Sequence, residues 1–399
     1  MKRWVISIVI FSTFLFSSNF EKIAYNYFYA LVNENYKVAY NLSSNTMKQH
    51  LPIEKIKKIW QQITSTYGNF EKIVKFQIIE KPPYKVFIFT SKFKKSNLNI
   101  SITLNKEGKI DGLFFSIAQN VEYKIPQYVK SDKFSEKDVK VGDLPGKLTI
   151  PKEHTKYAVI LIHGSGPQDM DETIGPNKIF KDIAYALSSN NIAVLRYNKR
   201  TLYQANENIT IKEEVINDVL KAIKLLKDYN YKEIYLLGHS LGAYVAPYIA
   251  TINDNISGLI LLAPPARNLE DVIIDQLKFL QNTSNEILQK LQKLKENKIP
   301  NDEFVLGAKA KYWYDLRNYN PLKYLGKVKT LILFGKNDYQ VTLKDYNIFK
   351  EHLTNNTKII LFNGLTHLFI PGEKTPNAYL IENHVDAKVI DEIIKFIKN

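Results

Sequence analysis

Two different patterns of apolar and polar residues divide the chain. Over residues 53–63 apolar residues recur at three- and four-residue steps with lysines between them, which predicts an amphipathic helix. Residues 98–104 instead alternate between apolar and polar, as in a half-buried strand, and the Asn-Lys-Glu-Gly sequence at 105–108 is typical of a hairpin turn. We therefore predict a small α+β domain over residues 19–117.

Short apolar runs separated by helical patterns dominate the chain after residue 147. This rhythm predicts a mostly parallel sheet with helices on both faces, filling residues 148–399. Residues 118–147 mix charges with proline and glycine, and we interpret them as a linker and lead-in. A length of 399 residues fits two folded domains, and 45% hydrophobic residues suffice for their cores.

One interval interrupts the alternation of strands and helices. About 65 residues lie between Pro265 and Thr330, which is too many for a simple crossover. Two apolar stripes at helical spacing, in residues 269–280 and 287–294, predict helices within it. We expect a helical cap at about 266–326 that covers a site at the carboxyl ends of the strands, and the alternative is extra packing against the sheet edge.

The Gly-His-Ser-Leu-Gly sequence at 238–242 carries the main chemical signal. It follows the apolar run 234–237 and precedes a helical stretch, so it predicts a sharp turn between a strand and a helix. Flanking glycines leave room around Ser240, and the turn would expose its hydroxyl at the edge of the sheet. Ser240 is therefore a candidate nucleophile, with an exposed turn serine as the structural alternative.

A serine nucleophile needs a base, and the base needs an acid that orients it. His367 directly follows the predicted strand that ends at residue 362, and Asp338 follows the strand that ends at residue 334. Loops after neighbouring parallel strands meet at one edge, so we predict a triad of Ser240, His367 and Asp338. His384 is the alternative base and Asp345 the alternative acid.

Acyl transfer also needs donors for the oxyanion of the tetrahedral intermediate. His163-Gly164-Ser165-Gly166 follows another predicted strand, and its small residues would let a backbone amide face the substrate. We expect the N–H groups of Leu241 and Ser165 to be the donors, with Gly166 as the alternative. His163 itself is interpreted as a structural residue of this loop.

Composition excludes several other chemistries. The chain has no cysteine, which removes disulfides, thiolate metal sites and cysteine nucleophiles. No histidine–carboxylate spacing indicates a metal site and no glycine-rich loop fits a nucleotide, so we expect no metal and no cofactor. The net charge of +15 is spread along the chain without a basic tract, and nucleic acid is not an expected partner.

The first residues have the pattern of an export signal. Lys2 and Arg3 precede an apolar run, and Ser17-Ser18 offers small residues for cleavage. The run is too short to span a bilayer comfortably, so we predict a cleaved signal peptide at 1–18 and no stable membrane span afterwards. The expected location is therefore secreted or periplasmic.

The motifs together resemble the α/β-hydrolase superfamily over residues 140–399. The sequence from Leu161 to Thr201 is similar to exported two-domain bacterial carboxylesterases, whose N-terminal domain of unknown function resembles residues 20–117. The resemblance implies an α/β-hydrolase fold, the same triad, and ester hydrolysis through an acyl-enzyme. Relatives usually read R-Y-D-K-R-G where this chain reads R-Y-N-K-R-T, ending at Thr201.

These observations predict a serine hydrolase that acts on small-molecule carboxylic esters of short to medium acyl length. The first alternative is an aminopeptidase-like amide hydrolase, because one triad serves both bonds. Acidic residues of the predicted cap, Glu270, Asp271 and Asp275, could then hold a substrate amine. The second alternative is a non-catalytic binding protein of the cell envelope.

Overall fold

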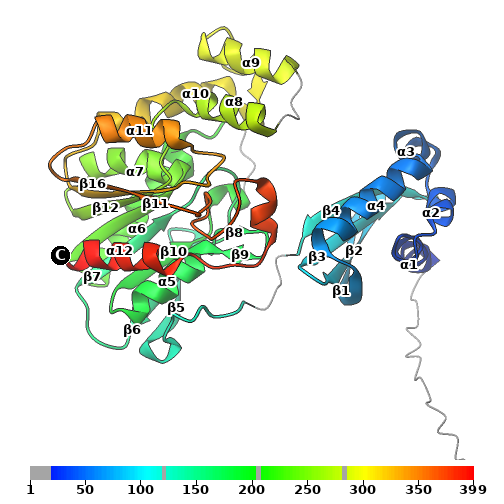
Figure 1. Cartoon of the computed structure of the whole chain (residues 1–399), viewed down its shortest axis with the longest axis horizontal. Helices are drawn as coiled ribbons and strands as arrows, with labels where there is room; N and C mark the ends of the chain where they lie inside the picture. The colour runs from blue at the N-terminus through cyan, green and yellow to red at the C-terminus, as the bar shows by residue number, and fades with distance from the viewer. Residues whose placement is uncertain (1–18, 119–122, 204–207, 281–284) are drawn as a thin grey trace, which may run out of the picture. The chain divides into compact units, whose positions relative to one another are not determined.

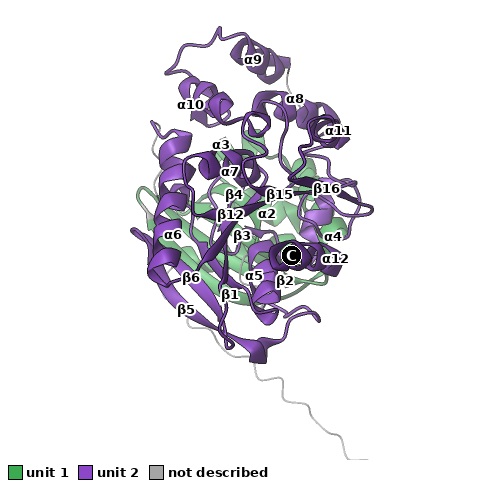
Figure 2. Cartoon of the chain, turned by 90° about the vertical axis from the view of Figure 1, so that its left-hand side faces the viewer, with its two compact units in different colours: residues 1–121 green, residues 122–399 purple. Residues whose placement is uncertain are grey.

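The computed structural model describes residues 19–118, 123–203, 208–280 and 285–399. The chain divides into two compact units, residues 1–121 and 122–399 (Figure 2). The predicted signal peptide at 1–18 lies outside the described residues. Within the described ranges, none of the helices is long and apolar enough to cross a membrane.

The first unit combines four helices with a four-stranded antiparallel sheet of order β1-β2-β3-β4 (Figure 1). Its elements are α1 (Asn19–Val32), α2 (Tyr36–Leu42), α3 (Asn45–His50), α4 (Ile53–Tyr67), β1 (Phe70–Lys81), β2 (Tyr84–Phe93), β3 (Asn97–Leu104) and β4 (Ile110–Ile117).

The predicted periodicities of this unit correspond to observed elements. Helix α4 buries Ile56 and Trp60, and β3 buries every second residue. In the turn after β3, the Asn105 side-chain oxygen accepts the N–H groups of Glu107 and Lys109, both at 3.0 Å. Local sequence thus specifies both the helix and the hairpin.

The second unit is built on an eight-stranded sheet of order β16-β15-β12-β11-β7-β10-β6-β5 (Figure 1). Its strands are β5 (Phe134–Val141), β6 (Leu144–Pro151), β7 (Tyr157–Ile162), β10 (Ala193–Tyr197), β11 (Glu233–His239), β12 (Ile256–Leu262), β15 (Lys329–Gly335) and β16 (Thr357–Phe362). The strands from β16 to β10 run parallel, whereas β6 is antiparallel to both β10 and β5. The sheet therefore begins at Phe134, within the segment interpreted as linker and lead-in.

Helices cover both faces of this sheet, as the alternating pattern predicted. Helices α5 (Ile179–Ser189) and α12 (Ala387–Lys398) pack together on one face, and α6 (Asn217–Asp228) lies on the other face (Figure 2). Helix α7 (Leu241–Thr251) contacts the π-helical turn Lys212–Ile216 that leads into α6. Helix α11 (Leu343–Glu351) packs on β16.

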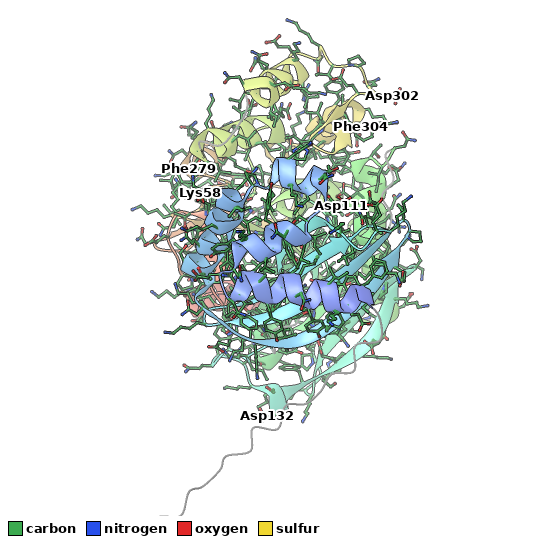
Figure 3. The ribbon with its side chains drawn as sticks, turned by 90° about the vertical axis from the view of Figure 1, so that its right-hand side faces the viewer. Lys58, Asp111, Asp132, Phe279, Asp302 and Phe304 are labelled. Carbon is green, nitrogen blue, oxygen red and sulfur yellow. The ribbon has the colours of Figure 1, made fainter. Side chains whose placement is uncertain are left out.

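The long interval after β12 forms a group of helices that we call the cap. It contains α8 (Leu269–Leu280), α9 (Asn285–Lys295) and α10 (Ala310–Leu316), with the short hairpin β13 (Phe304–Val305) and β14 (Ala308–Lys309) before α10. Asp302 and Phe304 lie on this part of the molecule (Figure 3). The two apolar stripes in the sequence correspond to α8 and α9, whereas α10 was not predicted.

Candidate active site

Ser240 occupies a tight turn between β11 and α7. Its backbone has φ 51° and ψ −112°, a left-handed conformation that L-residues adopt at a cost of about 1–3 kcal/mol. The Ser240 N–H donates to the Leu262 carbonyl at 2.9 Å, and the Ser240 carbonyl accepts from Tyr244 N–H at 2.9 Å. Strand and helix thus hold the strained residue from both sides.

The two glycines of this motif are required by close packing. A Cβ atom on Gly242 would lie 2.1 Å from the Ile162 carbonyl oxygen, so α7 can approach β7 only because this side chain is missing. A Cβ atom on Gly238 would lie 2.4 Å from the Ala243 nitrogen. Both distances are shorter than real carbon contacts allow, and the turn depends on glycine at both positions.

Asp338 and His367 form a close pair beside this turn. The His367 Nδ1 atom lies 2.6 Å from Asp338 Oδ2, and both side chains are almost fully buried. The other Asp338 oxygen accepts the N–H groups of Gln340 at 2.6 Å and Val341 at 2.9 Å. The carboxylate is thus fixed by the loop after β15, and it in turn orients the imidazole.

Ser240 and His367 border the same cavity of about 420 Å³, which we call the serine cavity. Gly164, Tyr339 and Tyr379 also line it. A second cavity of about 440 Å³, the cap cavity, is bordered by Leu241 and by residues of the cap. Three residues line both cavities: Ser165, Leu269 and Ile273.

The proposed oxyanion residues lie at this junction. Leu241 and Gly166 border the cap cavity, and Ser165 borders both cavities. An added Cβ on Gly164 would lie 3.4 Å from Ser240 Cβ, so the loop after β7 passes directly beside the serine. This proximity follows from the strand order, because β7 and β11 are neighbours.

His163 stabilises the same loop. Its Nε2 atom lies 3.0 Å from the Asp169 carbonyl oxygen, and its ring packs against Phe180 and Tyr197. Burial lowers the pKa of His163 to about 4, so the imidazole is neutral at neutral pH. A neutral, enclosed histidine fits the structural role that the sequence suggested.

The sequence analysis did not predict a buried carboxylate–imidazole pair formed by Glu172 and His239, the residue directly before Ser240. His239 Nδ1 lies 3.0 Å from Glu172 Oε1, and His239 Nε2 lies 3.0 Å from the His367 carbonyl oxygen. Glu172 Oε1 also accepts the Gly164 N–H at 2.7 Å. The pair therefore joins the loop after β7, the serine turn and the histidine loop.

The electrostatics of this pair favour charge on both partners. Burial alone raises the pKa of Glu172, but attraction by His239 and the hydrogen bonds from His239 and Gly164 outweigh burial and lower it. Burial alone lowers the pKa of His239, but Glu172 and the His367 carbonyl outweigh burial and raise it. No local pattern in the sequence indicates this contact, because Glu172 lies 67 positions from His239.

The two alternative residues have other partners. His384 Nδ1 lies 3.1 Å from Asp182 Oδ1, and this hydrogen bond is the main reason that the pKa of His384 is raised. Asp345 forms an ion pair with Arg267 at 2.8 Å and accepts the Ala266 N–H at 3.0 Å. Neither residue borders the serine cavity or the cap cavity.

In the part of the chain that the structure describes, groups of three or more histidine, aspartate or glutamate side chains able to hold a metal ion do not occur. The polar groups of the serine cavity instead suit proton transfer between a hydroxyl and an imidazole.

Both units match known protein families. Residues 153–310 match the family described as serine aminopeptidase, S33, and residues 24–113 match a domain of unknown function, DUF3887. The chain is 45% identical to Esterase EstD of Thermotoga maritima over 393 residues, which cover 95% of each protein. The chain belongs to this family of α/β hydrolases. It is a hydrolase of the esterase type.

Solved structures of α/β hydrolases are also similar. Est1E from Butyrivibrio proteoclasticus is 18% identical, and the match covers 66% of this chain and 99% of Est1E with a TM-score of 0.46. Pyrococcus horikoshii acylaminoacyl peptidase is 15% identical, and the match covers 82% of this chain and 56% of the peptidase with a TM-score of 0.49.

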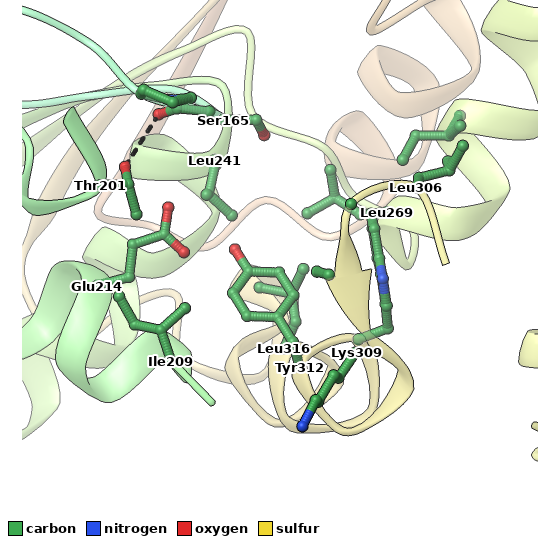
Figure 4. Close-up of a pocket in the computed structure, with 16 residues that line it drawn as sticks. Ser165, Thr201, Ile209, Glu214, Leu241, Leu269, Leu306, Lys309, Tyr312 and Leu316 are labelled. Atoms are coloured by element: carbon green, nitrogen blue, oxygen red, sulfur yellow. Dashed lines mark hydrogen bonds between the residues drawn. The ribbon is translucent and has the colours of Figure 1, made fainter. Parts of the chain in front are cut away.

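The departure of this hydrolase from the usual R-Y-D-K-R-G sequence lies beside its cavities. Thr201 borders the cap cavity, and its hydroxyl donates to the Gly166 carbonyl oxygen at 3.5 Å (Figure 4). Asn198 accepts the Met170 N–H at 2.7 Å through its side-chain oxygen. Thr201 in place of glycine therefore adds a side chain to the wall of the cap cavity. Neither replaced residue contacts the Asp338–His367 pair.

Proposed function

We propose that this protein hydrolyses carboxylic esters of short to medium acyl length by a Ser240–His367–Asp338 triad. The observation that carries the proposal is the 2.6 Å contact between His367 and Asp338 beside the cavity that Ser240 also borders. The strained backbone of Ser240 supports it, because such strain is typical of nucleophile turns.

The reaction proceeds in two halves. His367 takes the hydroxyl proton as the Ser240 oxygen attacks the ester carbonyl carbon, and it then gives that proton to the leaving alcohol. Water next attacks the acyl-enzyme, again with His367 as base, and releases the carboxylic acid and the free serine. Asp338 orients the imidazole and stabilises its charged form.

Backbone amides stabilise the negative oxygen of each tetrahedral intermediate. We assign this role to the N–H groups of Leu241 and Ser165, with Gly166 as the alternative to Ser165. The position of all three residues around the cavities supports the assignment. One such donor contributes about 2.7–4 kcal/mol to the stability of a transition state.

The acidic residues of the cap favour ester over aminopeptidase chemistry. Glu270 pairs with Arg317 at 2.6 Å, Asp271 with Lys295 at 2.5 Å, and Asp275 with Arg267 at 2.8 Å. These three residues do not border the serine cavity or the cap cavity. Each carboxylate already has a basic partner, so none is placed to receive the ammonium group of a peptide.

Kinetics with matched substrates test the proposal. Wild type is expected to hydrolyse nitrophenyl esters of graded acyl length far faster than aminoacyl anilides, and Ser240→Ala to lower kcat by roughly a millionfold. Ser135→Ala, which changes an exposed serine of β5, serves as the control and should retain wild-type kcat. Faster cleavage of anilides would favour the aminopeptidase, whereas equal inactivity of wild type and Ser240→Ala would favour a binding protein.

We also propose export to the cell envelope or the medium, on the basis of the signal-like residues 1–18. N-terminal sequencing of the protein recovered from its native cells tests this. A mature N-terminus near residue 19 is expected, and retention of Met1 would contradict it.

A further inference from the structure

The serine cavity and the cap cavity suit different parts of an ester. His367 must protonate the leaving oxygen, and His367 borders the serine cavity but not the cap cavity. The leaving alcohol therefore belongs in the serine cavity. Leu241, Ser165 and Gly166 border the cap cavity, so the acyl chain, whose carbonyl oxygen faces the oxyanion donors, belongs there. This assignment rests on the proposed function.

Most of the cap cavity wall is apolar. Its larger side chains come from α7, from the cap helices and from the cap hairpin: Leu241, Leu269, Ile273, Leu306, Trp313 and Leu316. Such a wall suits a hydrocarbon chain, because each buried methylene group contributes about 0.8 kcal/mol. The chemically distinctive part of the wall is a single carboxylate, that of Glu214.

Glu214 belongs to a buried ion pair. Its Oε1 atom lies 2.6 Å from Lys199 Nζ, and the two side chains are only 5% and 2% exposed. Lys199 also donates to the Gly164 carbonyl oxygen at 2.8 Å. Burying two charges is expensive, so a pair of this kind at a cavity wall is a candidate for function.

The backbone presents Glu214 to the cavity in an unusual way. Residues 212–216 form a π-helical turn at the start of α6, and Glu214 stands at its centre. Turns of this type are rare and occur frequently at functional sites, because the extra residue redirects a side chain. The Glu214 carboxylate points into the space enclosed by the cap (Figure 4).

Tyr312 faces this carboxylate from the cap. The side chain comes from α10, and its hydroxyl points towards Glu214 (Figure 4). Burial, with the negative charge of Glu214 and a direct hydrogen bond to that carboxylate, raises the pKa of Tyr312 well above its usual value. The phenol is therefore protonated and able both to donate and to accept a hydrogen bond.

The charges around the cavity select the kind of group that could bind between these oxygens. An ammonium group would face Lys199, which already neutralises Glu214, and a carboxylate would be repelled by Glu214. Lys309 also borders the cavity, but its amine is held by Asn208 at 3.1 Å and by Asp302 at 3.4 Å. A neutral hydrogen-bond donor fits best.

We propose that the cap cavity binds an acyl chain that carries a hydroxyl group, which replaces the direct hydrogen bond between Tyr312 and Glu214: it donates to the Glu214 carboxylate and accepts from the Tyr312 hydroxyl. The preferred substrates are then esters of hydroxycarboxylic acids rather than of plain alkanoic acids. Glu214 and Tyr312 determine specificity and take no part in bond making or breaking.

A purely structural role for Glu214 predicts something different. If Glu214 only anchored Lys199, and through it the Gly164 loop, its loss would slow all esters equally. Recognition of a hydroxyl changes the ratio between a hydroxylated ester and its methyl counterpart. That ratio is insensitive to a general loss of activity, which makes it the decisive quantity.

The experiment compares kcat/KM for nitrophenyl 6-hydroxyhexanoate and nitrophenyl heptanoate, in which a methyl group replaces the hydroxyl. We expect wild type to prefer the hydroxy ester, and Tyr312→Phe and Glu214→Gln each to reduce that preference about tenfold, as loss of one buried hydrogen bond would. Tyr314→Phe is the control, because Tyr314 lies on the same helix but donates to the Ile299 carbonyl at 2.8 Å.

Tyr312→Phe keeps the Lys199–Glu214 ion pair, so it tests the proposal even if Glu214→Gln folds poorly. A wild type without preference for the hydroxy ester, or a preference unchanged in Tyr312→Phe, would overturn the proposal. Either result, obtained with an enzyme that cleaves heptanoate and loses that activity in Ser240→Ala, rejects the hydroxyl site alone. Absence of Ser240-dependent cleavage of both esters rejects the proposed function instead.

Discussion

The pKa values of two buried histidines near Ser240 are shifted in opposite directions because their neighbours differ. At His163, burial lowers the pKa more than the attraction of Glu172 and Asp169 raises it. The positive charge of Lys199 lowers it further, so the pKa falls to about 4. At His239, burial also lowers the pKa, but the direct contact with Glu172 Oε1 at 3.0 Å outweighs it. The contact with the Glu172 carboxylate therefore raises the pKa of His239 despite its burial.

The depressed pKa of His163 predicts a loss of stability in mild acid. A histidine in an unfolded chain has a pKa near 6.5. Between pH 7 and pH 5 the unfolded chain therefore binds a proton at His163 that the folded protein does not bind. With a pKa of about 4 in the folded protein, this difference in proton binding lowers the free energy of unfolding by about 2 kcal/mol at pH 5. His163→Gln should remove that part of the loss, measured as urea midpoints at the two pH values.

His154→Gln is the matched control, because His154 is exposed and should leave the acid sensitivity unchanged. The absolute stability of His163→Gln also changes through its lost contact with Asp169, so only the difference between the two pH values is decisive. The same difference in wild type and His163→Gln would contradict the assignment.

At the scale of elements, three loops meet because their strands end at one edge of the sheet. Glu172 ties them together, since it accepts from Gly164 in the loop after β7 and contacts His239 at the end of β11. His239 in turn reaches the carbonyl of His367, after β16. The distances between the proposed oxyanion donors, Ser240 and His367 therefore depend in part on this buried pair.

Glu172→Gln is expected to lower kcat/KM by about tenfold to a hundredfold, because small displacements of catalytic groups are costly. The fall should appear mainly in kcat, since binding in the apolar cap cavity is unaffected. Steady-state kinetics with one nitrophenyl ester measure it. Glu303→Gln, which removes a surface ion pair with Lys290 at 2.7 Å, is the control. Unchanged kcat in Glu172→Gln would show that the pair has no positioning role.

The sequence predicted the elements that carry strong periodicity or an uninterrupted apolar run. Strand β7 ends directly before His163, where a strand was predicted, and α4 begins at Ile53 as expected. Strand β1 was missed because most of its side chains are exposed, so its sequence mixes lysines with apolar residues and lacks a clear period. Helix α10 was missed because seven residues are too short for a periodic signal.

The candidate site was predictable to the extent that its residues follow strands directly. Ser240, Asp338 and His367 could each be proposed from a motif after an apolar run. Glu172 and Glu214 could not, since each acquires its role from a partner that only the fold brings near, such as Tyr312. Long-range pairs of this kind leave no local pattern in the sequence.

At the scale of the whole molecule, the residues that the structure describes form two hydrophobic cores. One is built from residues 24–110 and the other from residues 141–397. Ser240, Asp338 and His367, together with both cavities, belong to the second unit. The chemistry proposed for the protein is therefore carried by residues 122–399, with its nucleophile at a single serine.

Covalent labelling of the intact protein tests that claim most directly. Diethyl nitrophenyl phosphate should transfer one diethylphosphoryl group to the chain and release nitrophenol, and peptide mapping should place the label on Ser240. His367→Gln should slow the labelling strongly, because the hydroxyl then lacks its base. A label on another residue, or equal labelling of Ser240→Ala, would contradict the account.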